Sequence, residues 1–244
     1  MTRNPGGAVY FDCTGTLYDP QSDQRAHLEA ARELIRLFKL SVTPQSLVER
    51  FSGFANRFLQ KRDADEFMAG DDMLRAVLPH FGTMLGIAKT HENFEQVKAI
   101  VRKMHCDHGK LMPGAIETLA GVRERGFHVG LISHVDDHLL GALLESLGIN
   151  GCFDSVTTAE EARVCKPDPR IFELALRKSG LEPTQAFFVG DDPGRDIQAA
   201  KSMGFRTVYY RTSEEAPLAP EVSDFTIRGL TELLAILDGA GQTG

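Results

Sequence analysis

The chain has 244 residues, of which 42% are apolar, and its 27 basic and 34 acidic residues give a net charge of −7. This length and composition suit one large domain, or a core with a second domain inserted into it, and exclude disorder as the main state. The acidic balance disfavours a nucleic-acid partner, and no apolar run approaches the ~18 residues of a membrane span. The N-terminus has no signal-peptide pattern and the four scattered cysteines fit no disulfide or zinc framework, so we expect a cytoplasmic protein.

The first predicted element is a buried strand, Ala8-Val9-Tyr10-Phe11, which leads directly into the hexapeptide Asp12-Cys13-Thr14-Gly15-Thr16-Leu17. An aspartate at the C-terminal tip of a strand, on a tight glycine turn, lies where ligands bind in an open α/β sheet. A carboxylate at that place is suited to act as a nucleophile, a metal ligand, or both.

A long helical segment follows this strand. From about Gln24 to His108 the apolar residues recur at three- and four-residue spacing, and no strand pattern interrupts them. We therefore predict a helical cap domain over 20–108, inserted into a core formed by 1–19 and 109–244. Because the insertion leaves the core after Leu17 and returns before Pro113, both of its ends lie close to Asp12, and we expect it to act as a lid.

From Leu111 onward, strand and helix patterns alternate. Helices are predicted over 114–125, 137–147, 169–178, 195–203 and 229–237, and strands over 127–132, 155–158, 186–189, 206–210 and 224–227. Strands that alternate with helices imply βαβ crossovers. The predicted fold is therefore α/β: a Rossmann-like, mostly parallel sheet with an inserted α-helical cap.

Three further polar features fall at strand tips or helix starts: Ser133, Lys166, and the run Gly190-Asp191-Asp192-Pro193-Gly194-Arg195-Asp196. In a parallel sheet these tips share one edge and converge on Asp12. Several carboxylates in one place would repel one another unless a cation joined them, and Mg²⁺ prefers such hard oxygen ligands. A cation, a lysine, a hydroxyl group and the N–H groups of glycine turns together suit a phosphoryl group.

These residues, in this order, resemble the motifs of the haloacid dehalogenase-like hydrolases: DCTGTL, then Ser133, then Lys166, then GDDPGRD. The resemblance implies that Asp12 is the nucleophile and an Mg²⁺ ligand, with the Thr14 backbone carbonyl and Asp191 as further ligands. It implies that Ser133 and Lys166 hold phosphoryl oxygens. Further metal candidates are Asp192 and Asp196, and further substrate-binding candidates are Gly15, Thr16 and His134. The implied activity is Mg²⁺-dependent hydrolysis of a small phosphorylated metabolite through an aspartyl phosphate.

Two positions depart from the family pattern. The family's phosphatases usually carry an aspartate at the place of Thr14, where it protonates the leaving group and then activates water. A threonine hydroxyl does neither near neutral pH, so we expect slow turnover of ordinary phosphate esters. The second departure is His134, which stands where the family often has asparagine.

Two other functions remain open. In a dehalogenase, Asp12 would attack carbon and need no acid at position 14, although the acidic GDDPGRD run would then have no explanation. A catalytically weak phosphate- or metabolite-binding regulator is the other alternative. The run His105-Cys106-Asp107-His108 also has metal-binding residue types, but no matching ligand set stands out elsewhere, so we expect no metal there. The oligomeric state does not follow from the sequence.

Overall fold

The computed structural model describes residues 6–60, 78–79, 81–83, 85–88, 90–135, 137–212 and 221–240. The chain divides into two compact units. We call 1–19, 111–135 and 148–244 the sheet unit, and 20–110 with 136–147 the helical unit. Helix α6 (Asp137–Ser146) therefore belongs to the helical unit, although we expected it in the core. Residues 61–77 of the expected cap lie outside the described residues.

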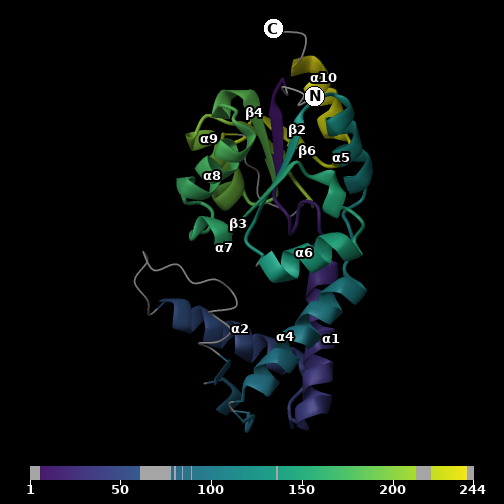
Figure 1. Cartoon of the computed structure of the whole chain (residues 1–244), viewed down its shortest axis with the longest axis vertical. Coiled ribbons are helices and arrows are strands. Elements are labelled where there is room, and N and C mark those ends of the chain that lie inside the picture. Colours follow the sequence, from purple (N-terminus) through teal and green to yellow (C-terminus); the bar gives the residue numbers. More distant parts are fainter. Residues whose placement is uncertain are drawn as a thin grey trace. The chain divides into compact units, whose positions relative to one another are not determined.

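The sheet unit is built on a six-stranded parallel sheet, which confirms the predicted fold class (Figure 1). Its strands are β1 (Ala8–Phe11), β2 (His128–Ser133), β3 (Ser155–Thr158), β4 (Ala186–Gly190), β5 (Arg206–Tyr210) and β6 (Phe225–Ile227). The strand order is β3-β2-β1-β4-β5-β6. The order therefore reverses at β1, and the crevice at the carboxyl ends of β1 and β4 is the place where such sheets bind ligands.

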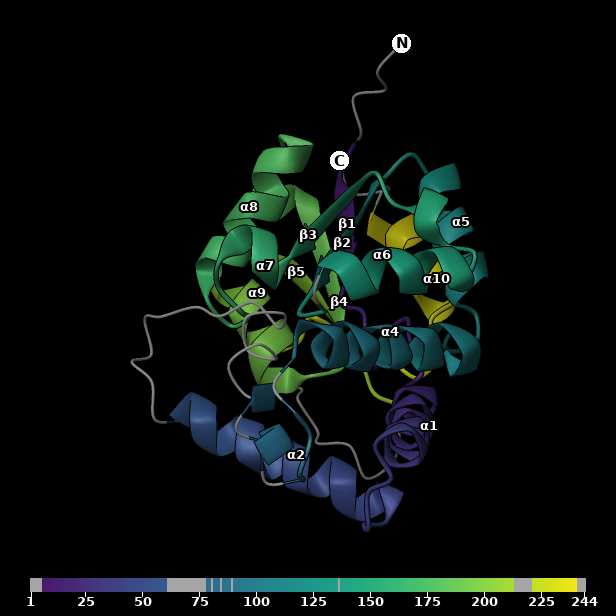
Figure 2. The ribbon, with the colours of Figure 1, turned by 60° about the horizontal axis from the view of Figure 1, so that its bottom comes forward.

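Helices cover both faces of this sheet, as Figures 1 and 2 show from two directions. One face carries α5 (Ala115–Glu124) and α10 (Glu232–Ala240), and the other carries α8 (Pro169–Ser179) and α9 (Ala199–Ser202). Because both faces are covered, β1 and β4 are apolar runs in which every residue is buried. The short elements of this unit are α7 (Ala159–Ala162), the 3₁₀ turns η1 (Asn150–Cys152) and η2 (Pro183–Gln185), and the π-helical turn η3 (Pro193–Gln198).

The turn η3 is the clearest departure from the predicted elements. We predicted one helix over 195–203, whereas the chain forms η3 and then the short helix α9. The side chain of Asp192 accepts hydrogen bonds from the N–H groups of Gly194 and Arg195, so winding starts earlier than the apolar pattern indicates. The N–H groups of both Asp196 and Ile197 donate to the Asp192 carbonyl, which gives the wide π-helical turn.

The helical unit contains α1 (Pro20–Phe38), α2 (Pro44–Gln60) and α4 (His91–His108) in addition to α6 (Figure 2). Two apolar clusters hold it together. The first cluster consists of Ala26, Ala30 and Met104 with the partly buried Ile100 and Val101, and it joins α1 to α4. The second is centred on Ala31, Leu47 and Phe81 and joins α1 to α2. Across the part of the chain that is described, no helix has the length and apolar character needed to cross a bilayer.

Candidate active site

The first two candidate carboxylates lie at the tips of neighbouring strands. Phe11 pairs with Val189 in the sheet, and the Asp12 N–H donates to the Val189 carbonyl over 2.9 Å. Asp12 thus begins the loop after β1, while Asp191 follows the last residue of β4. The two carboxylates lie near each other because the adjacent parallel strands β1 and β4 end level with each other.

A third carboxylate, Asp196, completes the cluster. One ligand oxygen each of Asp12, Asp191 and Asp196 lies within 4.8 Å of the others. Asp196 comes from η3 and is only 2% exposed, because the π-helical turn directs it back toward the strand tips. Of the two carboxylates between which the sequence did not decide, Asp196 is the one that joins Asp12 and Asp191.

Asp192 has a different role in the structure. Its Oδ1 accepts hydrogen bonds from the N–H groups of Gly194 (2.9 Å) and Arg195 (2.8 Å), and its Oδ2 accepts from Arg195 Nε at 2.8 Å. These bonds lower the pKa of Asp192 against the effect of burial, which acts in the opposite direction. Asp192 is thus the cap of η3, and it orients Asp196 through the backbone.

Two glycines allow the carboxylates to approach the backbone. Gly15 has φ +95°, and a Cβ there would lie 2.2 Å from Asp191 Oδ2. A Cβ at Gly190 would lie 2.6 Å from the Cβ of Asp196. The glycine of the opening hexapeptide is therefore needed for space as well as for its backbone conformation.

Lys166 supplies the positive charge of the cluster. Its Nζ donates to Asp12 Oδ1 at 2.5 Å and to Asp196 Oδ1 at 2.7 Å, and the residue is 3% exposed. Burial alone would lower its pKa, but the two carboxylates outweigh burial and raise the pKa above its ordinary value. Lys166 therefore stays charged and holds Asp12 and Asp196 on either side of its ammonium group.

The carboxylates also change each other's protonation. Burial, reinforced by the charges of Asp12 and Asp196, raises the pKa of Asp191 from 3.8 to about 7. Burial also raises the pKa of Asp196, with the charge of Asp12 as the next cause, and Lys166 opposes that shift. The metal-free cluster thus retains a proton near neutral pH, in the position where a cation would relieve the repulsion.

Ser133 and His134 come from the end of β2. Phe11 pairs with Leu131, so β2 runs two residues past the end of β1 and finishes beside the loop that follows Asp12. The Ser133 hydroxyl is fully buried and accepts a hydrogen bond from the N–H of Val135 at 3.0 Å. His134 Nε2 accepts from the backbone N–H of Lys166 at 2.7 Å, so His134 positions the lysine.

The protonation of His134 fits this contact. Burial first, and then the charge of Lys166, lower its pKa from 6.5 to about 4. Near neutral pH the ring is therefore uncharged, and its Nε2 is free of a proton and able to accept. The sequence identified His134 only as a departure from the family pattern and did not indicate its bond to Lys166.

The loop after Asp12 is closed by its own backbone. The Cys13 carbonyl accepts from the N–H groups of Leu17 and Tyr18, both at 2.8 Å, and the Gly15 N–H donates to the Tyr18 carbonyl at 2.9 Å. Thr14 lies half-buried within this loop. The Thr16 hydroxyl is fully buried and has no hydrogen-bond partner among the described residues, which leaves it available to a ligand.

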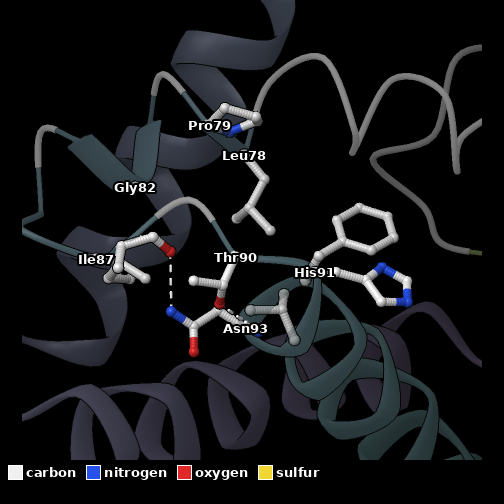
Figure 3. A pocket seen from close by; sticks show the side chains of 10 residues that line it. Leu78, Pro79, Gly82, Ile87, Thr90, His91 and Asn93 are labelled. Atoms are coloured by element: carbon white, nitrogen blue, oxygen red, sulfur yellow. Dashed lines mark hydrogen bonds between the residues drawn. The ribbon is translucent and has the colours of Figure 1, made fainter.

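A separate cavity lies within the helical unit (Figure 3). It has a volume of about 320 Å³ and is lined by the start of α4 and the preceding segment, with Leu78, Ile87 and Phe94 among the apolar residues. The Thr90 hydroxyl accepts from the Asn93 N–H, and Asn93 Nδ2 donates to the Ala88 carbonyl, which fixes the cavity wall. None of the candidate catalytic residues lines this cavity.

Comparison with known proteins agrees with the fold. The model of the haloacid dehalogenase-like hydrolase family matches residues 7–204. The chain is 27% identical over 235 residues to a glyceraldehyde 3-phosphate phosphatase of Methanocaldococcus jannaschii, covering 94% of this chain and 96% of that one. It is 36% identical over 134 residues to the haloacid dehalogenase-like hydrolase domain-containing protein 3 of Bos taurus, and there it spans only 52% of the relative's length.

Among solved structures, a 2-haloacid dehalogenase from Pseudomonas syringae superposes with a TM-score of 0.75 at 25% identity, over 95% of this chain and 98% of that one. The parallel sheet, the aspartate after its first strand and the cluster at the strand-order reversal define a hydrolase with an α/β core. The chain belongs to the haloacid dehalogenase-like hydrolases. The family resemblance seen in the sequence is thereby confirmed.

Proposed function

We propose that this protein is an Mg²⁺-dependent phosphatase of small phosphorylated metabolites, with Asp12 as the nucleophile that carries the phosphoryl group. The observation that carries this proposal is the charge of the buried cluster. With all three carboxylates ionised, as a bound cation would hold them, the carboxylates and the ammonium group sum to −2, from −3 and +1. A divalent cation balances that charge, and oxygen-rich clusters of this kind are the sites that Mg²⁺ prefers.

The residues for the metal are Asp12, Asp191 and Asp196, together with the backbone carbonyl of Thr14 as the family resemblance implies. The raised pKa of Asp191 fits a metal site, because a cation would take the place of the proton that this carboxyl group otherwise retains. The bound ion would supply neutralisation of phosphoryl charge.

In the proposed reaction, a carboxylate oxygen of Asp12 attacks phosphorus and the bond between phosphorus and the leaving-group oxygen breaks. Lys166 holds Asp12 Oδ1, so Oδ2 is the oxygen left for attack. Lys166 and Ser133 would bind phosphoryl oxygens, and the N–H groups of the loop from Gly15 to Thr16 would add further donors. Water then hydrolyses the acyl phosphate, which releases phosphate and restores the carboxylate.

Thr14 sets the rate in this proposal. The departing alkoxide needs a proton, and the hydroxyl of Thr14 cannot supply one near neutral pH. General acid–base catalysis is typically worth 10²–10⁴-fold, so esters with poor leaving groups should react slowly. The Methanocaldococcus relative, which aligns over nearly the full chain, supports a small phosphorylated substrate.

The four cysteines, all among the described residues, form no disulfide, which suits our expectation of a cytoplasmic protein.

The decisive experiment measures release of phosphate and of halide across a substrate panel, with Mg²⁺ and with chelator. Wild type should release phosphate only with Mg²⁺, Asp12→Asn should release none, and Thr14→Asp should gain turnover. Halide release that persists in chelator would instead make the protein a dehalogenase. Tight ligand binding without any turnover would favour a regulator, and an unchanged or lower rate in Thr14→Asp would refute the argument about the missing acid.

A further inference from the structure

The helical unit brings together three metal-binding side chains that lie far apart in the sequence. Asp23 and His27 project from α1, one turn apart, and His105 projects from α4. One ligand atom from each lies within 4.8 Å of the others. The structure therefore corrects our expectation that His105 has no ligand set elsewhere: the partners lie on α1 rather than in the run that ends at His108.

Both imidazole rings are held in one tautomer by the backbone. His105 Nδ1 lies 2.9 Å from the Val101 carbonyl, and His27 Nδ1 lies 3.0 Å from the Asp23 carbonyl. A carbonyl only accepts, so each Nδ1 carries the hydrogen. At His105 this leaves Nε2, which faces Asp23, as the ligand atom, while His27 Nδ1 also lies 3.6 Å from Asp23 Oδ2. This is the arrangement in which protein histidines usually bind metals, with the second nitrogen donating to a carbonyl.

The spacing and surroundings also suit a metal ion. His105 Nε2 lies 3.2 Å from Asp23 Oδ1, which is close to the edge of about 3.3 Å expected for a tetrahedron with zinc-to-ligand bonds of about 2.0 Å. The two rings meet edge to face with their centroids 4.6 Å apart. His105 is 3% exposed, and the apolar cluster of Ala26, Ala30 and Met104 lies between the same two helices. His27 is about half-exposed, which leaves a route for an ion to enter.

We propose that Asp23, His27 and His105 form a second metal site, specific for a zinc-class transition ion and separate from the carboxylate cluster. Two imidazoles and one carboxylate are the ligand types that zinc takes, whereas Mg²⁺ prefers oxygen alone. The three ligands leave one coordination position to water or another small ligand. Because the site links α1 to α4, the bound ion stabilises the helical unit. This inference does not depend on the phosphatase proposal.

The test uses Co²⁺ as a spectroscopic probe on chelator-treated, full-length protein, with excess Mg²⁺ added to compete for the carboxylate cluster. We expect the visible absorption bands of four- or five-coordinate Co²⁺, one ion per chain, and their loss when Zn²⁺ is added. His27→Gln should weaken Co²⁺ binding by at least about 10-fold, as should His105→Gln. Zn²⁺ should raise the thermal midpoint of the wild type and leave that of His27→Gln unchanged.

Two controls separate this site from other histidines and from the carboxylate cluster. His91→Gln removes an exposed histidine of the same helix α4, and Asp191→Asn alters the carboxylate cluster; both should keep the bands. Absence of the bands in the wild type would overturn the proposal and leave His105 and Asp23 as an ion pair only. Bands that survive in His27→Gln but vanish in Asp191→Asn would overturn it as well, because the ion would then belong to the carboxylate cluster. His27 is on the surface, so its variant tests the site even if His105→Gln does not fold.

Discussion

Replacing Asp191 with asparagine should stabilise the metal-free protein at alkaline pH. The pKa of Asp191 is raised from 3.8 to about 7 by burial and by the neighbouring charges of Asp12 and Asp196. The unfolded chain therefore releases this proton at lower pH than the folded chain does. The folded state loses stability as pH rises from about 4 to about 7, and the loss is complete above that range.

The size of the effect follows from the pKa shift. A shift from 3.8 to about 7 corresponds to roughly 4 kcal/mol of unfolding free energy above pH 7. At about pH 5 only the first part of that loss has occurred. The unfolding free energy of Asp191→Asn relative to the wild type should therefore increase by about 2.5 kcal/mol between about pH 5 and about pH 8. Asparagine has nearly the same shape as aspartate, which keeps the close contact with Gly15 comparable.

The measurement is urea unfolding of both proteins in chelator at the two pH values. Asp238→Asn is the matched control: its hydrogen bond from Arg125 lowers the pKa of that exposed carboxyl, so its neutralisation should not stabilise the protein. Excess Mg²⁺ should raise the stability of the wild type at the higher pH more than that of Asp191→Asn. A gain that is the same at both pH values would refute the reasoning, because it would mean that Asp191 is not held protonated by its surroundings.

Three further predictions concern other residues of the candidate site. Lys166→Met leaves two buried carboxylates without their partner and should lower the free energy of unfolding, measured in urea, by about 3–5 kcal/mol. The control Lys201→Met breaks an exposed pair and should lower it by less than ~1 kcal/mol. Gly15→Ala should weaken Mg²⁺ binding roughly 10–100-fold in calorimetry, while Gly148→Ala, also at positive φ but with open space around it, should leave binding unchanged. As pH falls from about 6.5 to about 4, the unfolding free energy of the wild type should fall by up to about 3 kcal/mol relative to that of His134→Gln, because the folded state keeps His134 neutral. Equal pH profiles of the two proteins would contradict this.

Much of the sheet unit could be predicted from the sequence because its rules are local. Apolar runs marked the central strands β1 and β4, and β3 and β5 have the bounds predicted for them. The start of α8 also followed from its residues, since Asp168 accepts from the Arg170 N–H and Pro169 occupies the first helical position. The meeting of polar residues at one edge then follows from parallel strands alone.

Other features depended on contacts between distant residues, which no spacing reveals. The π-helical winding of η3 arises because the Asp192 carbonyl accepts from two successive N–H groups, and an apolar pattern cannot distinguish this from an ordinary helix. Likewise α6 has a normal helical pattern, and only its packing assigns it to the helical unit. His105 was visible as a possible ligand, but Asp23 and His27 became its partners only through the packing of α1 against α4.

In the proposed reaction, two steps depend on different residues of the opening hexapeptide. Attack by Asp12 would depend on the cluster around it, in which β4 places Asp191, η3 places Asp196, and the bond from its N–H to His134 places Lys166. Protonation of the leaving group would depend instead on position 14, where the chain has threonine. In the proposed reaction the cluster fixes whether Asp12 attacks, and the acidity of the leaving group fixes how fast the reaction proceeds. Selection among substrates would then follow leaving-group chemistry as much as shape.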